Sequence, residues 1–417
     1  MTDQVALLLL DLALILVLAQ AFGALARRLG QPPVVGEILA GVLLGPTLFA
    51  GQFSALLIPT DVRPLLTPLA NVGVALFMFL VGLELDRSLI ASRRRVVIGV
   101  ALSATLVPFA LGSGLAWYLA DTYRTGNQLG FALFMGVAMG ATAFPVLARI
   151  LTDRDLQRTP LGALSLGIAA IGDLLVWTVL TGVVALVGGT GSEWRLTLAL
   201  PYLAVMLFAV RPLLARLAAR WTSGADARLL VVITTGVLAS GGVTEWLGLH
   251  FAFGAFLFGF VFPKGAGSDL RSDVARRVGS ITSVLLPVYF VTAGLKVDLS
   301  GVGASGLVDL ALVLVVAVGS KVGAGYCAAR LHKVPARDAA SLAVLLNTRG
   351  LTELVILTIG LQAGLLSQEL YSLMVVMALV TTAMTVPALT LIDRVHRRRN
   401  PVAAGVGTPP DDRTARS

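Results

Sequence analysis

The sequence predicts an all-α, polytopic membrane protein, and three observations support this fold class. Of the 417 residues, 57% are hydrophobic and only 13% are charged, whereas soluble domains carry about 25% charged residues. The mean hydropathy is +0.88. Apolar runs such as residues 14–25 and 310–319 are continuous, whereas membrane β-strands alternate apolar and polar residues. This composition excludes a soluble enzyme.

Apolar stretches separated by Arg-, Pro- and Gly-containing connections predict about thirteen spans, since each helical span needs about 20 apolar residues. In chain order we expect them at residues 5–26, 32–50, 66–85, 96–120, 129–151, 160–188, 197–220, 228–241, 246–262, 279–296, 305–330, 338–361 and 370–392. Residues 1–398 therefore form one transmembrane domain. The Gly-, Pro- and Asp-rich segment 399–417 predicts a disordered cytoplasmic tail.

Lys and Arg residues are distributed unequally between the connections. Those that follow odd-numbered spans are basic, whereas the others hold only Arg63, Arg124, Arg195 and Lys296. Because basic connections stay in the cytoplasm, we expect the N-terminus outside and the C-terminus in the cytoplasm. This bias accounts for the net charge of +9. No basic stretch interleaved with aromatic residues indicates nucleic-acid binding.

Two charged residues are expected deep in the bilayer, where a charge costs at least about 2.5–3.5 kcal/mol. Asp173 lies near the middle of the sixth span, and Lys321 lies inside the eleventh. A carboxylate can hold either a proton or a metal cation, so Asp173 is a candidate ion and proton site. Lys321 is its candidate charge partner. The alternative interpretation is structural: a hydrogen-bonded Asp173, or an ion pair that closes the core.

The fifth and twelfth spans are expected to be interrupted. The fifth contains Gly140, Thr142 and Pro145, and the twelfth contains the polar stretch 347–350. Non-helical backbone at this depth survives only where it is buried in protein or lines a cavity, and half-helix ends offer their dipoles to ions. The two spans are an odd number of spans apart and therefore run in opposite directions. We expect spans four to six and eleven to thirteen to be inverted repeats whose broken helices cross at the midplane.

Other polar residues are secondary candidates for the site: Glu37, Glu84, Asn347, Arg349 and Glu353. Glu84 is followed by Asp86 and Arg87, which favours an interfacial cluster over a transport ligand. Arg349 and Glu353 have i, i+4 spacing, which favours an internal structural pair.

Six segments together resemble the monovalent cation:proton antiporter-2 family. They are GEILAGVLLGP (36–46), FLVGLELD (79–86), GATAFPVLARIL (140–151), AAIGDLLVW (169–177), AGLKVDL (293–299) and NTRGLTELVILTIG (347–360). They occur in the family's order, and the resemblance covers about residues 5–392. It implies the sodium/proton antiporter fold and a homodimer in which each chain has a scaffold and a moving core.

The resemblance also implies which spans form each part. The scaffold would comprise helices in 5–85 and 228–296, the core those in 96–188 and 305–392, and the linker helix that in 197–220. Asp173 matches the family's essential ion-binding aspartate. Thr142 and Ala143 match the unwound stretch that helps to coordinate the cation, and Lys321 matches the basic residue that faces the carboxylates. Gly172 departs from the family pattern, because the family commonly has Asp, Asn or Gln at this position. In the family, that polar side chain is the usual first partner of the basic residue that Lys321 matches, and here it is missing.

These observations predict a secondary antiporter rather than an enzyme, with no cofactor, spanning the lipid bilayer of the cell membrane. It would exchange Na⁺ or K⁺ for H⁺ by alternating access, with Asp173 as the shared site. One titrating aspartate favours electroneutral one-for-one exchange, whereas proton release from Lys321 would make exchange electrogenic. The alternatives are an ion channel, or a proton-coupled transporter of another solute with Arg349 or Lys321 as counter-charge. An intramembrane hydrolase at Ser305 is a more distant one, because no His is suitably placed on a facing span.

Overall fold

The computed structural model describes residues 2–46, 58–59, 62–84, 93–156, 159–187, 194–220, 227–247, 251–263, 268–300 and 303–399, and every element in these ranges is a helix. Nine helical stretches there are long and apolar enough to cross a bilayer. They are α1 (Thr2–Arg28), α4 (Arg63–Glu84), α6 (Arg94–Tyr123), α9 (Pro160–Val187), the continuous stretch of α11 (Ala199–Val205), η2 (Met206–Val210) and α12 (Arg211–Arg220), α13 (Ala227–Trp246), α15 (Ser268–Leu295), α16 (Ala304–Leu331) and α19 (Gln368–Arg399). The predicted all-helical, polytopic class is confirmed.

Shorter helices complete the bundle: α2 (Pro33–Leu44), α7 (Gln128–Gly140), α8 (Phe144–Asp153), α10 (Trp194–Thr197), α14 (Phe251–Val261), α17 (Ala336–Leu346) and α18 (Leu351–Gln362). The predicted fifth span is the pair α7 and α8, and the predicted twelfth span is the pair α17 and α18. Both expected interruptions are therefore present.

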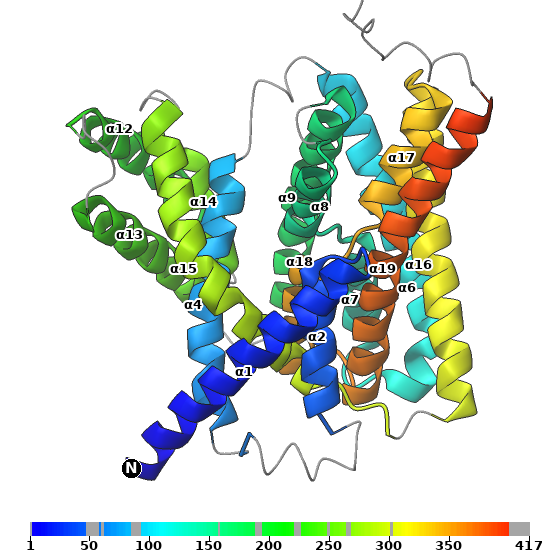
Figure 1. Cartoon of the computed structure of the whole chain (residues 1–417), viewed down its shortest axis with the longest axis horizontal. Coiled ribbons are helices and arrows are strands. Elements are labelled where there is room, and N and C mark those ends of the chain that lie inside the picture. Colours follow the sequence, from blue (N-terminus) through cyan, green and yellow to red (C-terminus); the bar gives the residue numbers. More distant parts are fainter. Residues whose placement is uncertain are drawn as a thin grey trace, which may run out of the picture.

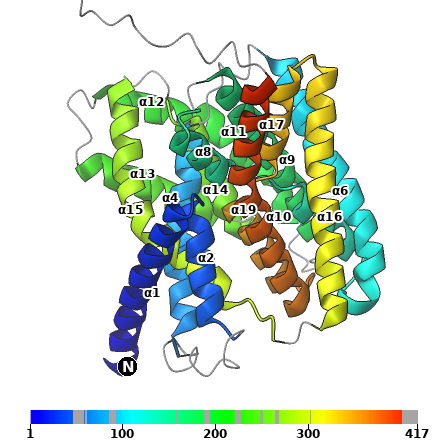
Figure 2. The same cartoon turned by 45° about the vertical axis from the view of Figure 1, so that its right-hand side comes forward.

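The helices pack as two groups (Figure 1). In one group α4 packs against α14 and α15, α2 packs against α1 and α15, and α13 packs against α14. In the other group α6 packs against α7, α9 and α16, and α17 packs against α16 and α19. Figure 2 shows α6, α16 and α17 side by side at one edge of the molecule. Asp173 and both helix interruptions belong to this second group.

Helix α4 and helix α14 approach closely because glycines face the neighbouring backbone. A Cβ on Gly82 would lie 2.1 Å from the carbonyl oxygen of Phe256, and one on Gly259 would lie 2.1 Å from that of Phe79. Small residues allow this approach in membrane bundles. The Phe79 ring lies beside that of Phe258, with 6.1 Å between centroids. This contact is apolar on both sides.

Several predicted boundaries are wrong, and most of these helices are longer than expected. Helix α13 continues to Trp246 instead of ending at residue 241, and α15 begins at Ser268 instead of residue 279. Helix α19 continues to Arg399, the first residue assigned to the tail. Hydropathy marks only the apolar part of a helix, whereas Arg and Lys are themselves good helix formers. Helix α2 is shorter and ends at Leu44, while residues 47–50 of that predicted span and tail residues 400–417 lie outside the described ranges.

Candidate functional site

The two helix interruptions meet each other. The first comprises residues 141–143, between α7 and α8, and the second comprises residues 347–350, between α17 and α18. The backbone amide of Ala143 donates a hydrogen bond of 2.9 Å to the carbonyl of Thr348. The Thr142 hydroxyl donates to the carbonyl of Leu346 over 3.2 Å. Each interruption therefore satisfies part of the backbone that the other exposes, as buried non-helical backbone requires.

Asp173 lies in α9 beside this crossing and is only 3% exposed. Its electrostatic neighbours are the ammonium group of Lys321 and the backbone amide of Phe144, at the start of α8. A helix N-terminus carries a partial positive charge, so α8 presents a favourable potential to the carboxylate. Neither Asp173 oxygen completes a hydrogen bond with a described residue. The carboxylate is thus buried beside a backbone amide and an ammonium group.

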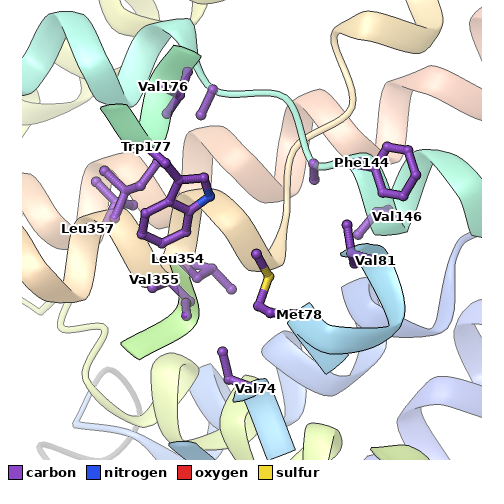
Figure 3. Close-up of a cluster of buried hydrophobic side chains, with 14 of the residues drawn as sticks. Val74, Met78, Val81, Phe144, Val146, Val176, Trp177, Leu354, Val355 and Leu357 are labelled. Carbon is purple, nitrogen blue, oxygen red and sulfur yellow. The ribbon is translucent and has the colours of Figure 1, made fainter. Parts of the chain in front are cut away.

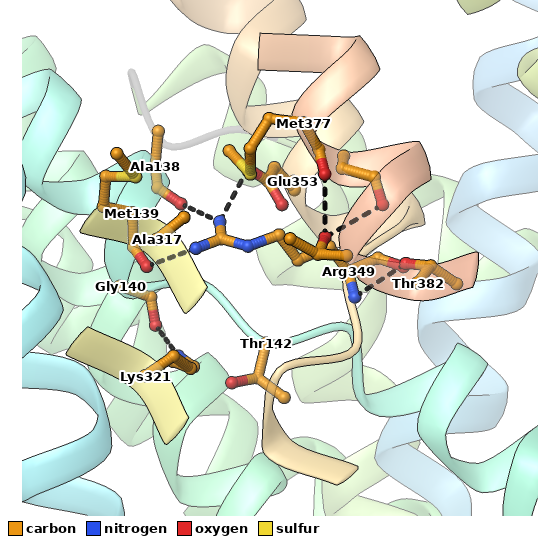
Figure 4. A network of polar contacts seen from close by, with 12 residues as sticks. Ala138, Met139, Gly140, Thr142, Ala317, Lys321, Arg349, Glu353, Met377 and Thr382 are labelled. Carbon is orange, nitrogen blue, oxygen red and sulfur yellow. Dashed lines mark hydrogen bonds and ion pairs between the residues drawn. The ribbon is translucent and has the colours of Figure 1, made fainter. Parts of the chain in front are cut away.

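Arg349 holds the carboxyl-terminal end of the broken helix α7 (Figure 4). Its Nη1 donates to the carbonyl of Ala138 and its Nη2 to that of Met139, both over 2.8 Å. Nη1 also contacts Glu353 Oε1 at 2.7 Å, and both side chains are almost completely buried. The predicted i, i+4 ion pair between Arg349 and Glu353 is confirmed. Because the last carbonyls of a helix have no partner within it, a guanidinium with several donors suits this position.

Lys321 donates to the next carbonyl of the same helix end, after those of Ala138 and Met139 that Arg349 binds. It is fully buried in α16 and donates a hydrogen bond to the carbonyl of Gly140, the last residue of α7 (Figure 4). Asp173, its predicted charge partner, acts on Lys321 through its charge, as do Arg349 and Glu353, whereas the hydrogen bond of Lys321 goes to the end of α7. The reason is the helix end, whose negative dipole and free carbonyls attract a cation.

The remaining sequence candidates lie in different places. Asn347 is buried in the second interruption, and its side-chain oxygen has no described partner. Glu37 is partly buried in α2 and lies against α1 near Gly23. Glu84 ends α4, is exposed, and lies near Arg271 of α15. The structure thus brings Asn347 to the crossing and keeps Glu37 and Glu84 in the other helix group, whereas Asp86 and Arg87 lie outside the described residues.

Two threonines that were not among the predicted site residues lie beside the residues of the site. The Thr382 hydroxyl, in α19, accepts a hydrogen bond of 3.0 Å from the amide of Arg349 and donates one to the carbonyl of the same residue. The Thr105 hydroxyl, in α6, lies 3.4 Å from where a Cβ on Gly172 would be. Adjacent threonines within an apolar span were a signal for Thr382, but Thr105 is one hydroxyl in an ordinary helix.

Apolar side chains separate the crossing from α4 (Figure 3). Val74, Met78 and Val81 of α4 face residues of three core helices. These are Phe144 and Val146 of α8, Val176 and Trp177 of α9, and Leu354, Val355 and Leu357 of α18. The polar crossing is thus bordered by apolar packing on the side of the other helix group.

Two interrupted helices that cross beside a buried carboxylate define a class, the secondary transporters with discontinuous helices. Residues 13–392 match the family described as sodium/hydrogen exchanger, transmembrane. The chain belongs to this family, as its resemblance to cation:proton antiporters predicted.

Similar proteins come from bacteria, plants and archaea. The Na(+)/H(+) antiporter NhaS4 of Synechocystis sp. is 35% identical, over 94% of this chain and 98% of its own length. Cation/H(+) antiporter 20 of Arabidopsis thaliana is 35% identical over 95% of this chain, which spans about half (50%) of that longer protein. The sodium proton antiporter MjNhaP1 of Methanocaldococcus jannaschii superposes with a TM-score of 0.72 at 13% identity, covering 94% of this chain and 99% of that one. This last likeness establishes the fold.

Proposed function

We propose that this protein is a secondary antiporter that exchanges a monovalent cation, Na⁺ or K⁺, for H⁺, with Asp173 as the shared site. The observation that carries the proposal is the Asp173 carboxylate, buried beside the two crossing interruptions with both oxygens unbonded to described residues. Membership of the sodium/hydrogen exchanger family supports it, and so do the names of relatives such as NhaS4.

Coupling follows from the chemistry of a single carboxylate. A buried, ionised carboxylate is costly without a counter-charge. When access to Asp173 switches from one side of the membrane to the other, Asp173 therefore carries either a cation or a proton. It cannot hold both, because each neutralises the same charge. The hydroxyl and carbonyl groups of the interruptions, including Thr142 and Ala143, would supply the further oxygen ligands that Na⁺ or K⁺ requires. One aspartate exchanging one cation for one proton gives electroneutral exchange.

Alternating access would occur by movement of the core, helices α6–α9 and α16–α19, against a scaffold of α1, α2, α4 and α13–α15, with α10–α12 as the linker. The apolar contact between α4 and the crossing (Figure 3) supports this division, because such packing has no directional bonds to break when one surface slides past the other. We further propose a homodimer in the cell membrane, with the N-terminus outside and the C-terminus in the cytoplasm.

Reconstitution in liposomes tests the proposal. The full chain is incorporated with a pH-sensitive dye inside, an imposed pH gradient, and Na⁺ or K⁺ added outside. Cation addition should change the trapped pH, and Asp173→Asn should reduce the change to that of protein-free liposomes. Asp309→Asn is the matched control: Asp309 is another buried carboxylate of the core, 8% exposed, but it accepts a hydrogen bond of 2.8 Å from Tyr123.

The same experiment separates the alternatives. Wild-type flux in Asp173→Asn would contradict the assignment of the site. Cation current without proton movement would indicate a channel, and proton flux dependent on an organic solute alone would indicate another coupled transporter. Clamping the membrane potential should leave the flux unchanged if exchange is electroneutral.

A further inference from the structure

A basic cavity lies at one end of the core, away from Asp173. It has a volume of about 690 Å³ and is formed by the first turn of α6, the first turns of α9 and the turn between α16 and α17. Its polar lining consists of Arg93, Arg94, Arg95, His332, Lys333 and Asp338. The apolar lining includes Leu161 and Leu164 of α9. Both basic segments belong to connections that the charge distribution places in the cytoplasm.

Cations outnumber carboxylates in this lining. Among the described lining residues there are three arginines and Lys333 but one carboxylate, that of Asp338. Within the described part of the chain, none of these five side chains forms an ion pair. The cavity therefore has an excess of positive charge, which favours an anion.

Two helix N-termini add to this potential. Helix α6 begins at Arg94 and helix α17 begins at Ala336, and neither has a side chain that caps its first amide groups. The free N–H groups and positive dipole at such a helix end bind phosphate-type anions. They act here together with the side-chain charges of the cavity lining.

The turn that carries Lys333 is held in one conformation. Arg330 donates to the carbonyl of Val334 over 2.7 Å, and the amide of Val334 donates to Ala329 over 3.0 Å. His332 packs on α6 so closely that a Cβ on Gly99 would lie 2.1 Å from its Nε2. Lys333 adopts a left-handed conformation, with a φ of 62°. The cavity wall is thus fixed by hydrogen bonds and by contact with α6.

We propose that this cavity binds the phosphate group of an anionic ligand. Arginine guanidinium groups pair with phosphate through two parallel hydrogen bonds, and a volume of this size is typical of small-molecule sites. The phosphate could come from the headgroup of an anionic phospholipid in the adjoining leaflet, since basic pockets between helices bind such headgroups, or from a soluble nucleotide. A bound phosphate would link the first turn of α6 to the α16–α17 turn.

Thermal unfolding of the purified full chain in a neutral detergent tests the proposal. The probes are short-chain phosphatidylglycerol, ATP and inorganic phosphate, with short-chain phosphatidylcholine as the zwitterionic reference. The cavity variant combines Arg94→Gln, Arg95→Gln and Lys333→Gln. The matched control combines Arg216→Gln, Arg228→Gln and Arg277→Gln, which removes three exposed arginine charges from α12, α13 and α15.

We expect at least one phosphate probe to raise Tm with saturation, because a ligand that binds only the folded state stabilises it. The cavity variant should need at least about tenfold more probe, since charge-assisted bonds to phosphate are lost, whereas the control should respond like wild type. Asp338→Asn should bind more tightly, because Asp338 is the only carboxylate among the described lining residues, and this variant tests the site even if the triple variant does not fold. A response to phosphatidylglycerol alone assigns a lipid headgroup, and a response to ATP or phosphate alone assigns a soluble ligand.

Three outcomes would overturn the proposal. They are no response of wild type to any phosphate probe, equal losses of affinity in both triple variants, and weaker binding by Asp338→Asn.

Discussion

The crossing in the core and the contact between α4 and α14 solve the problem of helix packing in a membrane in opposite ways. In the contact, both helices are continuous, and Gly82 and Gly259 let the two backbones touch. In the crossing, two helices are interrupted, and Arg349 and Lys321 donate to the carbonyls that the interruption leaves free. One region is held by close apolar packing and the other by charged groups bonded to backbone.

The difference between the crossing and the α4–α14 contact indicates where this fold can bind an ion. Among the described residues of α4 and α14, no buried side-chain oxygen or nitrogen lacks a partner, so their contact offers no free ligand to a cation. The crossing contains buried oxygen atoms without described partners, on Asp173, Asn347 and Thr348. Buried polar atoms without partners are costly, and the ion pair and carbonyl bonds of Arg349 keep the surrounding backbone in place despite that cost.

The largest expected effect comes from removing the charge that holds α7. Arg349→Met should lower the free energy of unfolding by about 3–5 kcal/mol, because Glu353 would remain buried without its partner. Thermal unfolding in detergent measures the effect. Arg337→Met is the matched control, since Arg337 pairs with Asp393 at the surface, where ion pairs contribute about 0–1 kcal/mol.

A double variant sharpens this result. Replacing both Arg349 and Glu353 by Met should recover part of the loss, because no unpaired charge remains. Recovery should stay incomplete, since the carbonyls of Ala138 and Met139 would still lack donors. Equal stability of Arg349→Met and wild type would show that the core is not held in this way.

The next effect concerns the close-packed region. Gly82→Ala should destabilise by about 1–3 kcal/mol, the usual cost of overpacking, because its Cβ would lie 2.1 Å from a backbone oxygen. In Gly242→Ala, on α13, the new Cβ meets no atom within 4 Å, so this control should be neutral or stabilising by up to about 1 kcal/mol. If both variants behaved alike in thermal unfolding, close approach would not be what stabilises this contact.

The smallest expected effect lies where the two regions meet. Lys296 follows α15 and lines a cavity of about 40 Å³ between α4, α15 and α18. Burial lowers its pKa below the ordinary lysine value. The folded state therefore loses this proton at a lower pH than the unfolded state does, so stability should rise as pH increases from the lowered pKa to the ordinary one.

Lys296→Met should abolish this rise and be more stable than wild type at neutral pH. Tm measured across an alkaline pH series tests it, and an unchanged profile would contradict it.

The residues best predicted from the sequence are those whose charge or polarity carries a free-energy cost in a bilayer. Asp173 and Lys321 stood out as charges in apolar runs, and the segments around Thr142 and Asn347 stood out as polar interruptions. The hydrogen-bond acceptor of Lys321, which is the carbonyl of Gly140, was not predicted. A carbonyl is present in every residue, so no sequence pattern marks it. Thr382 and Thr105 were missed for a related reason, since a hydroxyl in a helix bonds its own backbone in most positions.

The sequence by itself determined the all-helical class, the two interrupted spans and the Arg349–Glu353 pair, because hydropathy, chain breakers and i, i+4 spacing are local properties. Only the tertiary structure decided which groups meet across the chain. The crossing of the two broken helices was expected, but the structure decided its bonds, from the Ala143 amide to the Thr348 carbonyl and from the Thr142 hydroxyl to the Leu346 carbonyl. It also gathered Arg94 and Lys333 around one cavity. These contacts depend on how separate helices dock, and docking follows the shapes of whole helix surfaces, which no single segment specifies.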